Sequence, residues 1–211
     1  AHRDKKIFLR GSVDIIYSMK VLASALERLP VVASEGRNLG SVRDFIIDAE
    51  GWKVVAIAIS VRRVNCELLD IPKPFFGRPE AIVEIKYVSA IQNVILLQEK
   101  TVALATLIRN ISDSELAKSP VRLGNFKRRK VITTDGLIAG TVVETTIDTD
   151  GWLVESVDVS ISKDALRSVE MATAGKDSHV STIKLENVIN VSDYVTVKLG
   201  TSQLMDLLKP Q

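Results

Sequence analysis

Residues 31–52 read VVASEGRNLGSVRDFIIDAEGW, and residues 131–152 read VITTDGLIAGTVVETTIDTDGW. The two stretches lie one hundred positions apart and align without a gap. Gly40 meets Gly140 in this alignment, and Trp52 meets Trp152. The same offset returns further along, where residues 85–88 face 185–188 and residues 101–108 face 201–208. A register kept over so long a span indicates an internal duplication.

Each copy is built from short aliphatic runs separated by glycine turns. Gly36 and Gly136 can supply the positive φ that tight hairpins need. Gly40 and Gly140 stand inside a run, where a glycine indicates a bulge or a sharp bend. Residues 154–161 alternate apolar and polar side chains, whereas residues 54–59 are apolar on both faces. Such strands at this spacing predict a mainly β fold of two tandem small β-barrels, each with a short terminal helix.

The length of 211 residues is enough for two compact domains. We expect an N-terminal extension over residues 1–19, a first barrel over 20–111 and a second over 112–211. The middle of the two copies differs. Residues 68–77 form a Pro-rich segment with Phe75 and Phe76, whereas residues 164–171 predict a short helix.

Composition limits the classes of function. The net charge of +2 does not indicate a nucleic-acid partner. The chain has one cysteine, Cys66, so neither an internal disulfide nor a cysteine zinc cluster can form. No run of about 20 apolar residues is present, so we expect no direct membrane insertion. These features are typical of a cytoplasmic protein.

No residue pattern indicates catalysis, a cofactor or a metal site. The two histidines, His2 and His179, fit no nucleophile–base set. Asp48 and Asp148 each precede a Gly-Trp pair, where an aspartate commonly accepts a hydrogen bond from its own turn. A metal site there is the alternative, but the spacing of a calcium loop is missing. We therefore expect a protein that is not an enzyme and has no catalytic, cofactor or metal residues.

Three features are candidate interaction sites. The first is the adjacent aromatic pair, Phe75 and Phe76. The second is the apolar face of the terminal helices, which either covers its own barrel or docks a second subunit; its residues are Leu104, Leu107, Ile108, Leu204, Leu207 and Leu208. The third is a basic run that is either a solvated linker or a contact for RNA phosphates or an acidic partner; it consists of Lys127, Arg128, Arg129 and Lys130.

The two tryptophans hold equivalent positions in the copies. Equivalence under duplication favours a shared structural role for Trp52 and Trp152, although an exposed tryptophan can also anchor a partner. Arg62 and Arg63 would extend the basic run if the fold brought them next to it.

The succession of motifs resembles the PRC-barrel domain. It consists of a Val-Val strand, a glycine turn, LGSV (residues 39–42), DFIID (44–48), Gly51-Trp52, an aliphatic strand and IKYV (85–88). The resemblance extends over nearly the whole chain as two tandem copies. The usual Gly-Asp of that family before its last strand is replaced here by Gln92-Asn93 and Ser192-Asp193.

The resemblance implies a function that the residues alone do not. The chain is most similar to the archaeal branch of the family, which includes CdpB-like cell-division adaptors acting with the FtsZ ring and its membrane anchor SepF. It implies a dimeric, non-enzymatic adaptor recruited to the division site, with another PRC-barrel protein or a SepF-type anchor as partner. The alternative is a ribosome maturation or RNA-processing factor of the RimM type.

Overall fold

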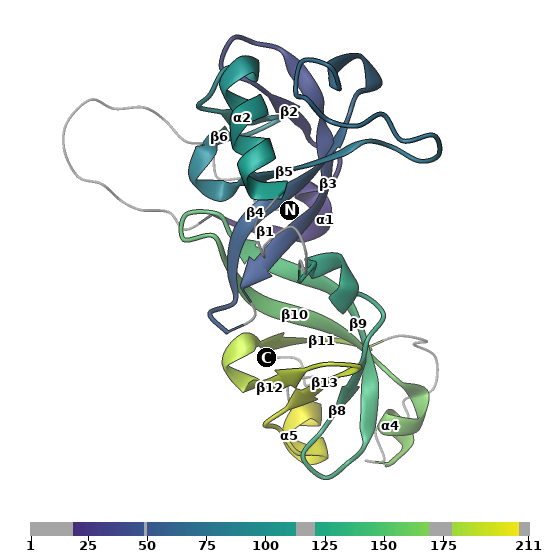
Figure 1. Cartoon of the computed structure of the whole chain (residues 1–211). Coiled ribbons are helices and arrows are strands. Elements are labelled where there is room, and N and C mark those ends of the chain that lie inside the picture. Colours follow the sequence, from purple (N-terminus) through teal and green to yellow (C-terminus); the bar gives the residue numbers. More distant parts are fainter. Residues whose placement is uncertain (1–18, 49, 113–120, 169–178, 207–211) are drawn as a thin grey trace, which may run out of the picture.

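The computed structural model describes residues 19–48, 50–112, 121–168 and 179–206 (Figure 1). The elements of the first half are β1 (Lys20–Leu22), α1 (Ala23–Leu26), β2 (Pro30–Val32), β3 (Asn38–Asp48), β4 (Lys53–Val61), η1 (Arg63–Asn65), β5 (Glu80–Glu84), η2 (Ile85–Tyr87), β6 (Val88–Ile91), β7 (Ile95–Leu97) and α2 (Thr101–Ser112). Those of the second half are η3 (Leu123–Phe126), β8 (Lys130–Ile132), β9 (Ile138–Asp148), β10 (Leu153–Ile161), α4 (Lys163–Ser168), β11 (His179–Lys184), η4 (Leu185–Asn187), β12 (Val188–Val191), β13 (Tyr194–Val197) and α5 (Thr201–Asp206). Strands predominate and the helices are short, so the predicted mainly β fold is confirmed, as is the predicted short helix near residue 164.

The strands of the first half form a curved sheet in the order β6-β7-β2-β3-β4, and β5 pairs with β4. Neighbouring strands are antiparallel except β2 and β7, which run parallel with Val31 opposite Ile95. The inward side chains are almost all aliphatic and fully buried, among them Ile57. Burial of this apolar surface is the main stabilising contribution to each half.

The second half has the same pairings one hundred positions later. Its order is β12-β13-β8-β9-β10, with β11 on β10, and β8 and β13 run parallel with Val131 opposite Val195. The last turn of the sheet also closes in the same way in both halves. The N–H of Gln92 donates to the carbonyl of Val94 at 3.0 Å, and the N–H of Ser192 donates to that of Tyr194 at 3.0 Å. The two pairs that stand in place of Gly-Asp, Gln92-Asn93 and Ser192-Asp193, thus form the same turn in both halves.

The two halves meet where β4 lies beside β10, and the sheet continues from one half into the other (Figure 1). Lys53 is opposite Leu153 at this junction. Two reciprocal hydrogen bonds flank the pair: the N–H of Val54 donates to the carbonyl of Trp152 at 2.7 Å, and that of Val154 donates to the carbonyl of Trp52 at 2.8 Å. Equivalent residues meet here, so a local twofold relation connects the halves.

Each half also sends an arm to the other half. The first arm, residues 19–26, pairs with β9, with Leu22 opposite Thr146. The second arm, residues 121–126, pairs with β3, with Arg122 opposite Ile46. These two contacts are equivalent under the hundred-residue offset. The segment 20–22, which lies within the predicted first barrel, thus pairs with a strand of the second half. The core buries apolar side chains of both arms, namely Ala23, Leu26, Leu123 and Phe126.

Two carboxylates hold the arms in place. Asp44 accepts a hydrogen bond from the N–H of Gly124 in the second arm at 2.9 Å, and burial raises the pKa of its carboxyl group. Glu144 occupies the equivalent position and accepts hydrogen bonds from Ser24 in the first arm. Burial works against ionisation of Glu144, but hydrogen bonds from Ser24 and Thr145 and the charge of Lys127 outweigh burial and lower the pKa of Glu144. We call this reciprocal pairing of the two arms the arm exchange. Lys127 contributes to the arm exchange, because its ammonium group lies 2.9 Å from Glu27 and 3.6 Å from Glu144.

An acidic side chain in the first turn of each half caps a terminal helix. Glu35 accepts hydrogen bonds from the N–H and the hydroxyl of Thr101 at the start of α2. Asp135 does the same for Thr201 at the start of α5, at 3.1 Å and 2.9 Å. A side-chain oxygen at this place satisfies an N–H that has no partner within the helix. The cap therefore attaches each terminal helix to the first hairpin of its own half.

Replacement of Asp135 by asparagine is expected to change the dependence of stability on pH. Hydrogen bonds from Thr133 and Thr201 lower the pKa of Asp135 from 3.8 to about 2. Because the folded pKa lies below the unfolded one, the stabilisation is complete above pH 3.8 and is lost as the pH falls towards 2. Urea unfolding of both proteins between pH 5 and pH 2 should show a difference that shrinks in this window. A difference that stays constant over that range would contradict the role of the carboxylate.

Candidate functional site

The apolar faces of the terminal helices lie against the core of their own half. Leu104 and Leu204 are fully buried, Ile108 is buried and Leu107 is half-buried, while Leu207 and Leu208 lie outside the described residues. Of the two roles that the sequence left open, this arrangement agrees with covering the helix's own barrel. The buried leucines are not available to a partner without opening the fold.

The basic run does not form one exposed patch. The ammonium group of Lys127 is engaged by Glu27 and Glu144. The Arg129 guanidinium lies 5.8 Å from the ring centre of Phe126, and its Nε donates to the carbonyl of Asn125 at 2.8 Å. These two side chains thus fasten the second arm. Arg128 and Lys130 are exposed.

The tryptophans and the turn aspartates have structural roles at the junction. Trp52 and Trp152 both have a positive φ, 53° and 52°, at the end of the turn that leads into β4 or β10. The ring of Trp52 packs edge to face against that of Phe126 in the second arm, with the ring centroids 5.5 Å apart. Asp48 and Asp148 each accept a hydrogen bond from the N–H two residues later, which is the turn chemistry that we predicted. In the described ranges, no three His, Cys, Asp or Glu side chains lie close enough together to hold a metal ion.

Phe75 and Phe76 lie on the exposed loop between η1 and β5, which projects from the first half (Figure 1). Their side chains are 88% and 83% exposed. The two rings touch each other edge to face, with centroids 4.8 Å apart. The carbonyl of the next residue, Gly77, accepts a hydrogen bond from the Arg63 guanidinium at 3.4 Å, which connects the loop to the end of β4.

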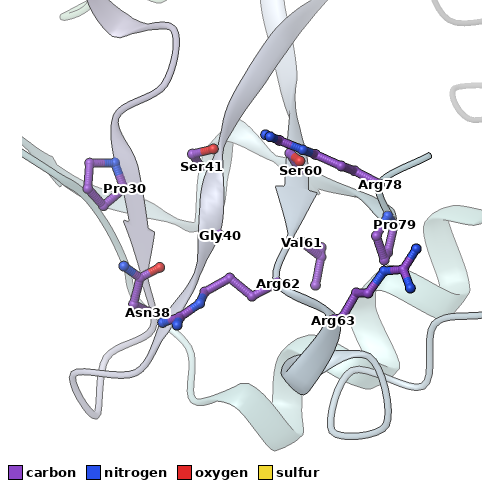
Figure 2. Close-up of a pocket in the computed structure, with 10 residues that line it drawn as sticks. All are labelled: Pro30, Asn38, Gly40, Ser41, Ser60, Val61, Arg62, Arg63, Arg78 and Pro79. Carbon is purple, nitrogen blue, oxygen red and sulfur yellow. The ribbon is translucent and has the colours of Figure 1, made fainter. Parts of the chain in front are cut away.

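Three arginines lie beside this loop around a hollow of about 480 Å³ (Figure 2). Arg62 and Arg63 follow the end of β4 in succession, so their side chains leave in different directions, Arg62 towards Asn38 and Arg63 towards Pro79. Arg78 precedes β5 and reaches over Ser60. The floor and walls are completed by Pro30, Asn38, Gly40, Ser41, Ser60, Val61 and Pro79.

Buried contacts beneath the hollow fix the backbone that carries these arginines. The side-chain amide of Asn65, only 2% exposed, donates to the carbonyls of Asn38 and Leu39 at 2.8 and 3.1 Å. These bonds hold the turn η1 against the start of β3. On the other side, the N–H of Val61 donates to the carbonyl of Pro79 at 2.8 Å, which positions the residue before it, Arg78.

A second hollow of about 420 Å³ continues from the first and shares Ser41, Ser60 and Arg78 with it. It adds Arg28 and Arg43. Together the two hollows form one surface, which we call the arginine groove; its arginines are Arg28, Arg43, Arg62, Arg63 and Arg78. Sequence reasoning missed this groove, because its arginines are scattered over fifty residues and only the sheet brings them together.

The second half keeps only part of the positive charge of the groove, with Arg128 at the position of Arg28. Arg62 and Arg43 are replaced by Ser162 and Val143 at the equivalent positions of the second half, and Arg63 by Lys163. Asn65 is replaced by Ala165, and the turn η1 by the helix α4. A comparison of the two copies for charge, position by position, would have revealed this difference in the sequence.

A family model matches the first half of the chain. It is that of the PRC-barrel domain, and the match covers residues 19–103. Residues 19–103 form a PRC-barrel domain. The arginine groove and the Phe75–Phe76 pair lie entirely within this domain, and α2 begins at its end. Comparison of the chain with curated proteins found no match.

The described part of the PRC-barrel domain and of the second half contains no helix with the length and apolar character needed to cross a membrane. Comparison thus identifies a PRC-barrel domain at residues 19–103 and no more. A PRC-barrel domain is a scaffold, so the function has to be argued from the residues on its surface.

Proposed function

We propose that this protein is a non-enzymatic adaptor that binds a partner protein through the surface of its PRC-barrel domain. One observation carries the proposal: two adjacent, almost fully exposed phenylalanines lie beside a groove lined by arginines. Aromatic residues and arginine are the residues most enriched at the centres of protein interfaces. A partner that covers the rings and places negative charge beside the arginines lowers the free energy of the complex.

The second half serves as a structural partner of the first in this proposal. We propose that it is a second PRC-barrel, because its pairings, its turns and the positive φ of its tryptophan repeat those of the first half. The two arms then act as the exchanged segments of a covalently linked dimer. Because the two copies differ in the residues of the groove, the first copy binds the partner and the second copy supports the first structurally.

The biological process follows from resemblance alone. We propose an accessory role in FtsZ- and SepF-based archaeal cell division, in which the adaptor contacts another PRC-barrel protein or the SepF-type anchor and is recruited to the division site. The arginines also suit RNA phosphates, which keeps a RimM-like role in ribosome maturation as the second candidate.

Replacement of both Phe75 and Phe76 by alanine is expected to abolish capture of the partner without loss of stability. Both rings are exposed, so thermal unfolding of the variant should match that of the wild type within about 0.5 kcal/mol. Affinity purification from native extract, with and without ribonuclease, checks the prediction. A partner protein should be retained after ribonuclease by the wild type and lost with the variant.

The matched control replaces two exposed apolar residues of the second half, Val180 and Ile189, by alanine. This control should capture as much partner as the wild type. Recovery of ribosomal proteins that disappear with ribonuclease would contradict the adaptor and favour the RNA-processing role. Undiminished capture by the phenylalanine variant would exclude the surface proposed here.

A further inference from the structure

We propose that the arginine groove binds an acidic, extended segment of the partner protein, with its carboxylates on Arg62, Arg63 and Arg78 and an apolar side chain on the Phe75–Phe76 pair. This inference rests on the proposed adaptor function and names the chemical class of its partner. It follows from the charge, the shape and the aromatic edge of the groove.

Within the part of the chain that the structure describes, acidic side chains neutralise the charge of the groove only in part. Among the described residues, Arg28, Arg62 and Arg78 have no acidic partner within salt-bridge distance. Arg43 pairs with Glu80 at 2.8 Å, and that carboxylate is shared with Arg122 at 2.5 Å. The remaining guanidinium groups present planar sets of donors, which carboxylates satisfy two bonds at a time.

Glu27 is the one acidic residue in the lining of the groove. Its carboxylate is occupied by Lys127 of the second half at 2.9 Å. Lys127 thus compensates the negative charge of Glu27, the residue next to Arg28. An incoming carboxylate therefore meets an excess of positive charge at Arg28, Arg62 and Arg78.

The shape of the groove suits a chain rather than a compact molecule. Its two hollows join over the pair Ser41 and Ser60, which are opposite each other on β3 and β4. Both serines are only half-buried, so their hydroxyl groups and Asn38 are accessible for hydrogen bonds to a backbone. One end of the groove leads to the loop with the exposed phenylalanines, which offers an apolar anchor next to the charged contacts.

The aromatic geometry favours a peptide over a single-stranded nucleic acid. The two rings meet at an interplanar angle of 81° and form one apolar knob. A nucleic acid that binds through stacking uses rings with free faces along a continuous basic track. Here the arginines end at Glu27 and Glu80, so the basic surface is short.

Fluorescence anisotropy with the 211-residue chain tests the inference. The probe is a labelled peptide of about twelve residues, Asp and Glu with Leu-Phe at each end, so that an apolar pair can reach the phenylalanines whichever way the extended peptide lies. The comparison probes are the same peptide with Asn and Gln in place of the acids, and a labelled oligouridine. The test variant combines Arg62→Glu and Arg78→Glu.

The control variant combines Arg128→Glu and Lys184→Glu, which changes the net charge by the same amount on exposed residues of the second half. We expect the acidic peptide to bind the wild type and the control alike, and to bind the test variant about tenfold more weakly or worse. Circular dichroism should show that both variants are folded. The neutral peptide should bind at least about tenfold more weakly than the acidic one, since it lacks the charged contacts.

Three results would overturn the inference: no binding of the acidic peptide to the wild type, equal binding of the test and control variants, or preferential binding of oligouridine through Arg62 and Arg78. The outcome is separate from that of the adaptor proposal. Capture of a partner that depends on Phe75 and Phe76, without any affinity for the acidic peptide, would retain the adaptor and reject an acidic segment as its ligand.

Discussion

Replacement of Gly40 by alanine is expected to lower the free energy of unfolding by about 3 kcal/mol or more, or to prevent folding. A Cβ atom at this position would lie 2.1 Å from the carbonyl oxygen of Ser60 and 2.9 Å from its carbonyl carbon. Both are backbone atoms of the paired strand β4, so neither can move aside without breaking the ladder. Gly140 is in the same situation, with a Cβ 2.2 Å from the oxygen of Ser160.

Chemical denaturation of Gly40→Ala and of Gly136→Ala measures this effect against a matched control. Gly136 has a φ of +83° but open space around the position of its Cβ, so alanine there should cost only about 1 kcal/mol. The loss at Gly40 comes from a steric clash and should clearly exceed that figure. Equal losses at the two positions, or no loss at Gly40, would contradict the close approach of β3 and β4.

The second large effect concerns the association of the halves. A protease site inserted within residues 113–120 allows the chain to be cut between them. We expect the two fragments to stay together at about 1 μM in native buffer, because each holds an arm that pairs with the other. Size-exclusion chromatography should show one peak at the mass of the uncut chain, and separate fragments only in denaturant.

Gly124→Leu provides the comparison for the cut protein. Even a Cβ there would lie 2.8 Å from the Asp44 carboxylate, so a larger side chain should weaken the second arm and let the fragments separate at lower urea concentration. Fragments that elute separately in native buffer without any substitution would show that the arms do not hold the halves together.

Much of the fold could be predicted because its determinants are local. Glycine turns such as the one at Gly36, alternating side chains and the Asp-x-x-Gly-Trp turn indicate strands and hairpins through short-range chemistry. The arm exchange could not be predicted, because the pairing of Leu22 with Thr146 depends on which surfaces meet after the sheets have formed. Nothing in the residues 19–26 distinguishes a strand of the first half from one added to the second.

The candidate site was predictable only in part. The adjacent aromatics Phe75 and Phe76 are visible in the sequence of their Pro-rich loop. The arginine groove was missed because residues 28, 43, 62, 63 and 78 form no run, whereas residues 127–130 do. In the structure, Lys127 of the run forms ion pairs, one of them between the halves, whereas the scattered arginines lie together on one surface.

Site-specific photo-crosslinking in living cells shows whether the surface around Phe76 contacts a partner protein. A photoreactive phenylalanine analogue at Phe76 retains the aromatic ring, and the same analogue at Val180, an exposed position of the second half, serves as the control. We expect a crosslinked protein band at position 76 that resists ribonuclease and is missing at position 180. Equal bands at both positions, no band at position 76, or a band removed by ribonuclease would contradict it.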